Sequence, residues 1–303
     1  MIAGDLFHRQ PLLRDLKEVD YLFSQMPDTD VVMIAGNHDY IRKDSYYRTF
    51  SWSENVHMLK EDTLTCVEFP AYDTAVYGCS YHARERTDKP YENMYARHRQ
   101  PYEILLLHGG DDKHMPIKKE EIMDLGYDYV ALGHIHKPQE LVPGMMAFPG
   151  APEAIDKNDT GAHGFIEGEI TAKGCRTRFV PFSAREYRDI EISVDKDTTI
   201  YELKEKIGEE IKTQGEQHLY KITLTGFADP DLLIDPADFD ELGNIVELTD
   251  ETAPIYHFEQ IYQQNKSNIL GGFIESFAGC SEGSVEYEAL LCGVKALMDT
   301  RRK

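Results

Sequence analysis

The chain has 303 residues, 41% of them hydrophobic, which is long enough for about two domains and apolar enough to exclude wholesale disorder. Its formal net charge of −22, with the larger acidic excess after Phe182, opposes long-range attraction to nucleic acid. No apolar run approaches the roughly 18 residues of a membrane span. No signal-peptide pattern opens the sequence, so we expect no association with a membrane.

Cysteine usage bears on the cellular compartment. The five cysteines are scattered, odd in number and never spaced as C-x-x-C. This pattern argues against a disulfide framework or a zinc knuckle and predicts a reducing, cytoplasmic location. We expect each thiol to be a small buried hydrophobe, with a catalytic thiol as the alternative. The cysteines are Cys66, Cys79, Cys175, Cys280 and Cys292.

Short apolar runs alternate with helical patterns through residues 1–182. Strands are expected at Met1–Ala3, Asp30–Ala35, Ala75–Gly78, Glu103–Leu107, Tyr129–Leu132, 164–170 and 176–182. Apolar residues at helical spacing between Leu12 and Met26, after Pro11, predict a helix, and shorter helices are expected near 90–99 and 116–124. This alternation predicts an α/β layered fold for residues 1–182.

The remaining chain divides into two further parts. Runs at Tyr187–Val194, Thr199–Thr213, Leu219–Thr225 and Asn244–Leu248 predict a small α/β domain over 183–254, with Ala228–Asp240 as its loop-rich connection. Residues 255–303 are expected to be helical. One apolar helix face there either packs on its own domain or docks a partner helix. That face comprises Ile269, Leu270, Phe273, Ile274 and Phe277.

Four polar fragments each follow an expected strand. They are Gly4-Asp5-Leu6-Phe7-His8, Gly36-Asn37-His38-Asp39, His108-Gly109-Gly110 and Gly133-His134-Ile135-His136. Each fragment alone is explained by ordinary turn chemistry or by a core histidine. Together they place five histidines, Asp5 and Asn37 at strand ends, where open α/β sheets bind ligands. These side chains suit Mn, Fe or Zn, so the combination predicts a metal site.

The four fragments resemble the metallophosphoesterase motifs of the calcineurin-like superfamily. The form GDLFH, with GHIHKPQ and the later Pro149-Gly150 segment, is most similar to SbcD-type DNA double-strand-break repair exonucleases, including the YhaO-like branch. This resemblance implies a layered metallophosphoesterase sandwich of two β-sheets flanked by helices. It also implies a small α/β capping domain and C-terminal helices.

The resemblance also implies roles for individual residues. Two divalent metal ions are expected, with Mn²⁺ as the expected metal. Asp5 would bridge both ions, Asn37, His108 and His134 would complete one site, and His136 would serve the other. His38 and His8 would be catalytic residues that bind no metal, steadying the phosphate and protonating the leaving oxygen. Asp39 is expected to orient His38 or to cap its loop.

One motif of the superfamily is absent from this sequence. The family begins with a strand ending in D-x-H, which supplies an Asp and a His to the site that also uses His136. Only four residues precede Asp5 here. We therefore expect either that the sequence starts inside a longer one or that the segment was lost naturally. In both cases the second metal site is expected to be incomplete and activity reduced.

Three functions remain open at this point. The first is a manganese-dependent DNA-repair exonuclease or endonuclease subunit. The second is a phosphodiesterase or phosphatase acting on nucleotides or phosphoproteins. The third is a catalytically impaired scaffold subunit of a repair complex. Expected partners are DNA, an SMC-type ATPase with a coiled coil, and a second copy of the chain in a homodimer.

A basic segment at residues 82–99 is the candidate contact for DNA. It combines arginines with Tyr91 and Tyr95, a mixture that can hold a phosphate backbone and stack an unpaired base. The alternative is an amphipathic helix whose charges are merely solvated. The candidate substrate-binding residues are Arg84, Arg86, Arg97 and Arg99.

Overall fold

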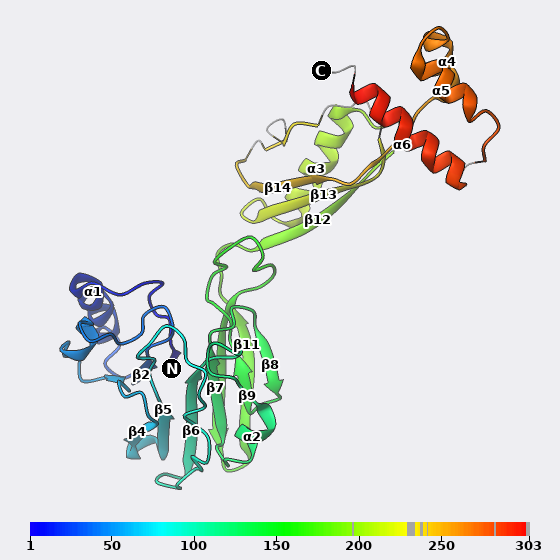
Figure 1. Cartoon of the computed structure of the whole chain (residues 1–303). Helices are drawn as coiled ribbons and strands as arrows, with labels where there is room; N and C mark the ends of the chain where they lie inside the picture. The colour runs from blue at the N-terminus through cyan, green and yellow to red at the C-terminus, as the bar shows by residue number, and fades with distance from the viewer. Residues whose placement is uncertain (196, 229–233, 237–238, 241, 282, 301–303) are drawn as a thin grey trace. The chain divides into compact units, whose positions relative to one another are not determined.

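The chain forms two compact units, Met1–Glu186 and Tyr187–Lys303 (Figure 1). The computed structural model describes all residues except 196, 229–233, 237–238, 241, 282 and 301–303. Much of the expected 228–240 connection therefore lies outside the described residues. The C-terminal segment that was expected as a separate part falls within the second unit. No helix in the described part of the chain is long and apolar enough to cross a membrane.

The first unit is built from three sheets with helices beside them. A three-stranded sheet has the order β1-β2-β3, a six-stranded sheet has the order β4-β5-β6-β7-β9-β8, and β10-β11 is a hairpin. The strands are β1 Ile2–Ala3, β2 Val31–Ile34, β3 Val56–Met58, β4 Thr65–Phe69, β5 Thr74–Gly78, β6 Tyr102–His108, β7 Tyr129–Gly133, β8 Gln139–Val142, β9 Met146–Phe148, β10 Gly164–Thr171 and β11 Gly174–Pro181. The helices are α1 Leu13–Ser24 and α2 Lys119–Met123. The predicted α/β layered fold is confirmed.

The two-sided packing of strand β6 explains why the run Ile104–Leu107 is apolar without alternation. Leu105 and Leu107 pack into a core that includes Ile122 of α2. Ile104 and Leu106 pack on the opposite side, in a core that includes Ile34 of β2. Because successive side chains of a strand point to opposite faces, the middle of a strand covered on both sides is apolar at consecutive positions.

The predicted helix near 90–99 is wrong. Residues 90–99 form turns and irregular chain, with Asn93 at φ 60° and His98 at φ 52° in the left-handed region. Left-handed residues end a right-handed helix. Tyr91 is buried, and its hydroxyl donates a hydrogen bond to the carbonyl of Pro116, which ties this segment to the chain before α2.

The second unit has a parallel sheet in the order β12-β13-β14, with β15 also paired to β13. Its elements are β12 Tyr187–Val194, α3 Ile200–Gln214, β13 Leu219–Ala228, β14 Ile245–Asp250 and β15 Ala253–Pro254. Helix α3 begins with a capping box, in which Thr199 and Glu202 each bond the other's backbone amide. Its apolar stripe, Leu203, Ile207 and Ile211, is buried in the same core as Ile190 and Ile222 of the sheet.

The described residues of this unit also form the helices α4 Phe258–Asn265, α5 Ile269–Ser276 and α6 Val285–Asp299. The apolar face predicted around Ile269–Phe277 mostly packs on its own unit. Leu270 and Ile274 are buried against Leu290 and Val294 of α6. Ile269 is the exception, with 80% of its surface exposed.

Candidate metal centre

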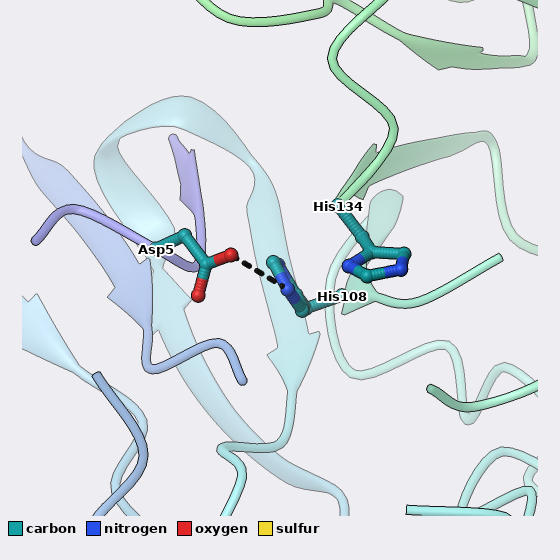
Figure 2. Close-up of side chains that lie close together, drawn as sticks. All are labelled: Asp5, His108 and His134. Atoms are coloured by element: carbon teal, nitrogen blue, oxygen red, sulfur yellow. Dashed lines mark ion pairs between the residues drawn. The ribbon is translucent and has the colours of Figure 1, made fainter. Parts of the chain in front are cut away.

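The polar fragments meet at the carboxyl ends of parallel strands. Strands β1 and β2 are parallel neighbours, and so are β6 and β7. Asp5 follows β1, Asn37 follows β2, His108 is the last residue of β6, and His134 follows β7. Figure 2 shows the side chains of Asp5, His108 and His134 gathered in one place, with Asp5 and His108 paired. These three residues form one group whose ligand atoms could hold a metal ion.

Asn37 joins this group through its side-chain oxygen. Its Oδ1 lies 2.9 Å from Nε2 of His108 and 3.1 Å from Nδ1 of His134. Nε2 of His108 lies 3.3 Å from Oδ2 of Asp5. The predicted ligands Asp5, Asn37, His108 and His134 therefore converge, with His108 and Asn37 almost fully buried.

A backbone carbonyl on the side away from the other ligands fixes the orientation of the His108 ring. Nδ1 of His108 lies 2.7 Å from the carbonyl oxygen of Ala3. A carbonyl only accepts, so Nδ1 carries the proton and Nε2 of the neutral ring offers a lone pair. That lone pair faces the oxygens of Asn37 and Asp5, which are also acceptors. A cation among these atoms resolves the repulsion, so the residues fit a divalent metal ion.

The protonation states of two ligands suit metal binding. Burial alone would raise the pKa of Asp5, but the imidazole of His108, in its protonated form when no ion is bound, and the amide of His38 hold that pKa below its ordinary value. Burial lowers the pKa of His134 more than the carboxylate of Asp111 raises it. A carboxylate and a neutral imidazole are the forms that bind metal.

The backbone is unusual where the site is assembled. Asp5 at φ 54° and His134 at φ 96° both lie at positive φ, where residues other than glycine are rare. Such backbone strain concentrates at functional sites. Gly36 permits the close approach of two loops, because a Cβ there would lie 2.2 Å from Oδ1 of Asp5.

His38 and His8 lie beside the ligands as a stacked pair. Their ring centroids are 4.8 Å apart with an interplanar angle of 25°. The backbone amide of His38 donates to Oδ1 of Asp5 at 2.8 Å, and Nδ1 of His38 lies 3.2 Å from the carbonyl oxygen of His8. His8 is exposed and His38 half-buried, so solvent reaches both residues.

Asp39 caps the loop that carries Asn37 and His38. Its Oδ1 accepts from the amide of Gly36 at 2.7 Å, and its Oδ2 accepts from the hydroxyl of Tyr47 at 2.9 Å. The amide of Phe7 approaches the same Oδ2 at 3.4 Å. Burial, followed by the charge of Asp5, raises the pKa of Asp39. Of its two expected roles, these contacts match the loop cap.

His136 lies apart from the four converging ligands. Its Nδ1 lies 3.5 Å from Oδ2 of Asp159, an acid that the sequence did not single out. Among the described residues, the group around Asp5 that could hold a metal contains His108 and His134 but not His136. A role for His136 in a second metal site therefore stays a prediction.

The four arginines have different environments. Arg86 is held by the carboxylate of Asp88 and by the backbone carbonyls of Asp62 and Ser80. Arg99 pairs with Glu68 at 3.1 Å. These contacts give Arg86 and Arg99 structural partners.

Arg84 and Arg97 are exposed, which makes them the better candidates for a substrate contact. The two tyrosines of the segment also differ. Tyr91 is buried and cannot stack a base, whereas Tyr95 is 58% exposed.

Sequence analysis missed Asp111 and His114. Oδ2 of Asp111 lies 2.9 Å from Nε2 of His134, and Nδ1 of His114 lies 3.0 Å from the same oxygen. The sequence does contain a pattern that points to them. His108 at the end of β6 is followed at intervals of three residues by Asp111 and His114.

Residues 1–138 match the family described as calcineurin-like phosphoesterase. This segment holds all four converging ligands, both stacked histidines and His136. This part of the chain is therefore similar to calcineurin-like phosphoesterases, as its motifs predicted.

Two curated proteins illustrate the relationship. The chain is 28% identical over 261 residues to "Uncharacterized metallophosphoesterase YhaO" of Bacillus subtilis, an alignment covering 78% of this chain and 61% of that protein. It is 24% identical over 233 residues to "DNA double-strand break repair protein Mre11" of Methanopyrus kandleri, covering 67% of this chain and 50% of that protein. The chain thus spans between half and about three fifths of these relatives.

Proposed function

We propose that this protein hydrolyses phosphodiester bonds in DNA, as a metal-dependent nuclease of DNA repair. The observation that carries the chemistry is the convergence of Asp5, Asn37, His108 and His134, with the stacked pair of His38 and His8 beside them. The choice of DNA as substrate is supported by the similarity to the Methanopyrus kandleri protein named for double-strand break repair.

The ligand set suits a phosphodiester substrate. When bound, divalent ions of such sites neutralise the phosphate and lower the pKa of a coordinated water. Asp5, Asn37, His108 and His134 would hold a cation, and three of these four ligands are neutral. The site therefore keeps a net positive charge that attracts the anionic substrate. We propose Mn²⁺, because the site mixes nitrogen and oxygen ligands.

His38 is placed to act on the leaving group. Its Nδ1–H donates to the carbonyl of His8, so the other ring nitrogen is the one free to face a substrate. When His38 is protonated, that nitrogen can donate a proton to the leaving oxygen. The exposed ring of His8 stacks on His38 and would steady the phosphate.

A second ion belongs to the same proposal. Asp5 and His136 would supply ligands to it, and Asp159, 3.5 Å from His136, is an acid that could join them. Elemental analysis of dialysed protein, compared with the His136→Ala variant, measures this contribution directly. A metal content unchanged by the substitution would exclude His136 as a ligand.

The deciding experiment offers two substrates side by side. Linear duplex DNA and a small bis-aryl phosphate are incubated with the protein and Mn²⁺, with and without chelator. We expect metal-dependent cleavage of both, and Arg84→Ala with Arg97→Ala should weaken DNA cleavage alone. Cleavage of the small ester without attack on any form of DNA would reject the nuclease.

The second candidate is hydrolysis of nucleotides or phosphoproteins. The net charge of −22 favours this second candidate. Such a charge repels a polyanion such as DNA more strongly than it repels a small substrate with few charges. Salt separates the candidates. Added salt screens the repulsion between the acidic protein and DNA. If this repulsion limits binding, activity on DNA should rise as the ionic strength is raised from very low to moderate.

We further propose an SMC-type ATPase with a coiled coil as the partner of the C-terminal helices. Ile269 and Val285, at the starts of α5 and α6, are 80% and 83% exposed and offer apolar contacts. Size-exclusion chromatography of the chain with and without a purified ATPase tests this, and also reports a homodimer. All five cysteines are free, which supports the proposed cytoplasmic location.

A further inference from the structure

His134 has a partner at each ring nitrogen. Nδ1 lies 3.1 Å from Oδ1 of Asn37, on the side of the converging ligands. Nε2 lies 2.9 Å from Oδ2 of Asp111, on the opposite side. An ionised carboxylate only accepts hydrogen bonds, so Nε2 carries the proton in its contact with Asp111. The lone pair of the neutral ring then resides on Nδ1, facing the metal centre.

Asp111 is itself held rigidly. Its Oδ1 accepts from the backbone amides of Lys113 at 2.8 Å and His114 at 2.9 Å. The amide of Gly110 donates to the carbonyl of His114 at 2.9 Å, which closes the loop. Gly109 allows this closure, because a Cβ there would lie 2.5 Å from the carbonyl oxygen of Met115.

His114 contacts the same carboxylate from another direction. Its Nδ1 lies 3.0 Å from each oxygen of Asp111, and its ring centroid lies 4.6 Å from that of His134. The carboxylate of Asp111 is therefore bonded by two rings and two backbone amides. Such a carboxylate cannot turn away from His134 without losing several hydrogen bonds.

We propose that Asp111 is a positioning residue of the metal centre, which fixes the tautomer and the ring orientation of His134 so that Nδ1 binds the ion, with His114 bracing the carboxylate. The inference rests on the proposed metal-dependent function. Carboxylates behind a ligating histidine raise its basicity, and removing such a partner typically costs about 10- to 100-fold in metal affinity.

A competing arrangement uses the same atoms. Asp111, His114 and His134 also form a group whose ligand atoms could hold an ion directly. In that case Nε2 of His134 would bind the ion and could not donate to Asp111. The observations favour positioning, because every contact is already a hydrogen bond of 2.9–3.0 Å and Nδ1 remains available to the group around Asn37.

The test is calorimetric titration of the metal-free protein with Mn²⁺, in the absence of any nucleic acid. Asp111→Ala is expected to weaken binding by about 10- to 100-fold without changing the number of ions bound. Asp111→Asn keeps an acceptor for Nε2–H and should recover part of the loss. Asp112→Ala is the matched control, since it removes the same charge from the neighbouring exposed residue and should leave affinity near that of the unaltered protein.

Two outcomes would overturn the inference. Affinity in Asp111→Ala equal to that in Asp112→Ala would mean that Asp111 does not position His134. Loss of one bound ion, with the affinity of the others unchanged, would make Asp111 a direct ligand. Circular dichroism of each variant confirms folding. Because the readout is metal binding alone, a protein that binds Mn²⁺ but leaves DNA intact would reject the nuclease and keep this inference.

Discussion

At the scale of single residues, the neighbours Asn37 and His38 make different contacts in the site. The side chain of Asn37 points among the rings of His108 and His134, whereas His38 contributes its backbone amide to Asp5 and its ring to the stack with His8. Because the ring of His38 is not among the candidate ligands, it can be removed without removing a ligand from the metal centre. The two functions of the site are therefore separable by substitution.

We predict that His38→Ala keeps the metal content of the protein but lowers turnover by about 10²- to 10⁴-fold, because it removes a proton donor and no ligand. His134→Ala should instead lower the metal content. Elemental analysis after dialysis and the rate of cleavage of the small ester measure the two effects. His257→Ala, an exposed histidine of the second unit, is the control. Equal metal loss in His38→Ala and His134→Ala would contradict the assignment.

The cysteines give a second prediction at this scale. Burial raises the pKa of Cys79 to about 11, and this thiol is fully enclosed, whereas Cys292 on α6 is exposed. Because the thiolate is the nucleophile, Cys79 should resist maleimide at pH 8 while Cys292 reacts. Peptide mass spectrometry after brief labelling measures this. Denatured protein, in which all five thiols react, is the control. Rapid labelling of native Cys79 would refute the prediction.

At the scale of elements, α3 illustrates how one cap supports a helix. Thr199 and Glu202 satisfy each other's backbone amides at its start, and three apolar residues hold it on the sheet of the second unit. Free backbone amides at a helix start are costly, so the cap contributes independently of the apolar stripe.

Thr199→Ala is expected to lower the free energy of unfolding by about 1 kcal/mol, because an amide of α3 loses its acceptor. Thr213→Ala, on the exposed last turn of the same helix, is the matched control and should be neutral or slightly stabilising, since alanine is the better helix former. Denaturant unfolding followed by circular dichroism compares the two variants. A larger loss in Thr213→Ala than in Thr199→Ala would show that the cap contributes nothing.

Structural features that depend on neighbouring residues in the sequence could be predicted, whereas contacts between separate segments could not. The presence of polar residues at strand ends is a local pattern. It predicted that Asp5, Asn37, His108 and His134 lie close together, as they do in the structure. The bond from Tyr47 to Asp39 and the bond from His134 to Asp111 join separate segments through side-chain orientation. No spacing rule reveals such orientation.

The failed helix near 90–99 has a related cause. Its composition suits an amphipathic helix, yet Asn93 and His98 adopt left-handed backbone and Tyr91 is drawn into the core of the first unit. Tertiary contacts here outweigh the local helical preference, which is a weak influence over so short a segment.

At the scale of the whole molecule, the four converging candidate metal ligands all belong to the first unit, Met1–Glu186. An ion that binds the folded state stabilises the unit that holds it by mass action, by about 2.7 kcal/mol when the free metal is roughly 100 times its dissociation constant. The second unit has its own apolar cores and supplies none of the four ligands. Metal should therefore act on one unit only.

We predict that Mn²⁺ slows hydrogen exchange in β6 and β7 of the first unit, by up to about 100-fold at that metal concentration, and leaves β12 and β13 of the second unit unchanged. Exchange followed by peptide mass spectrometry, with and without metal, measures both units in one sample. Chelator should reverse the effect, and His134→Ala should reduce it, since that variant lacks a ligand of the site. Equal slowing in β12 and β13 would show either that the two units unfold together or that the second unit binds metal itself.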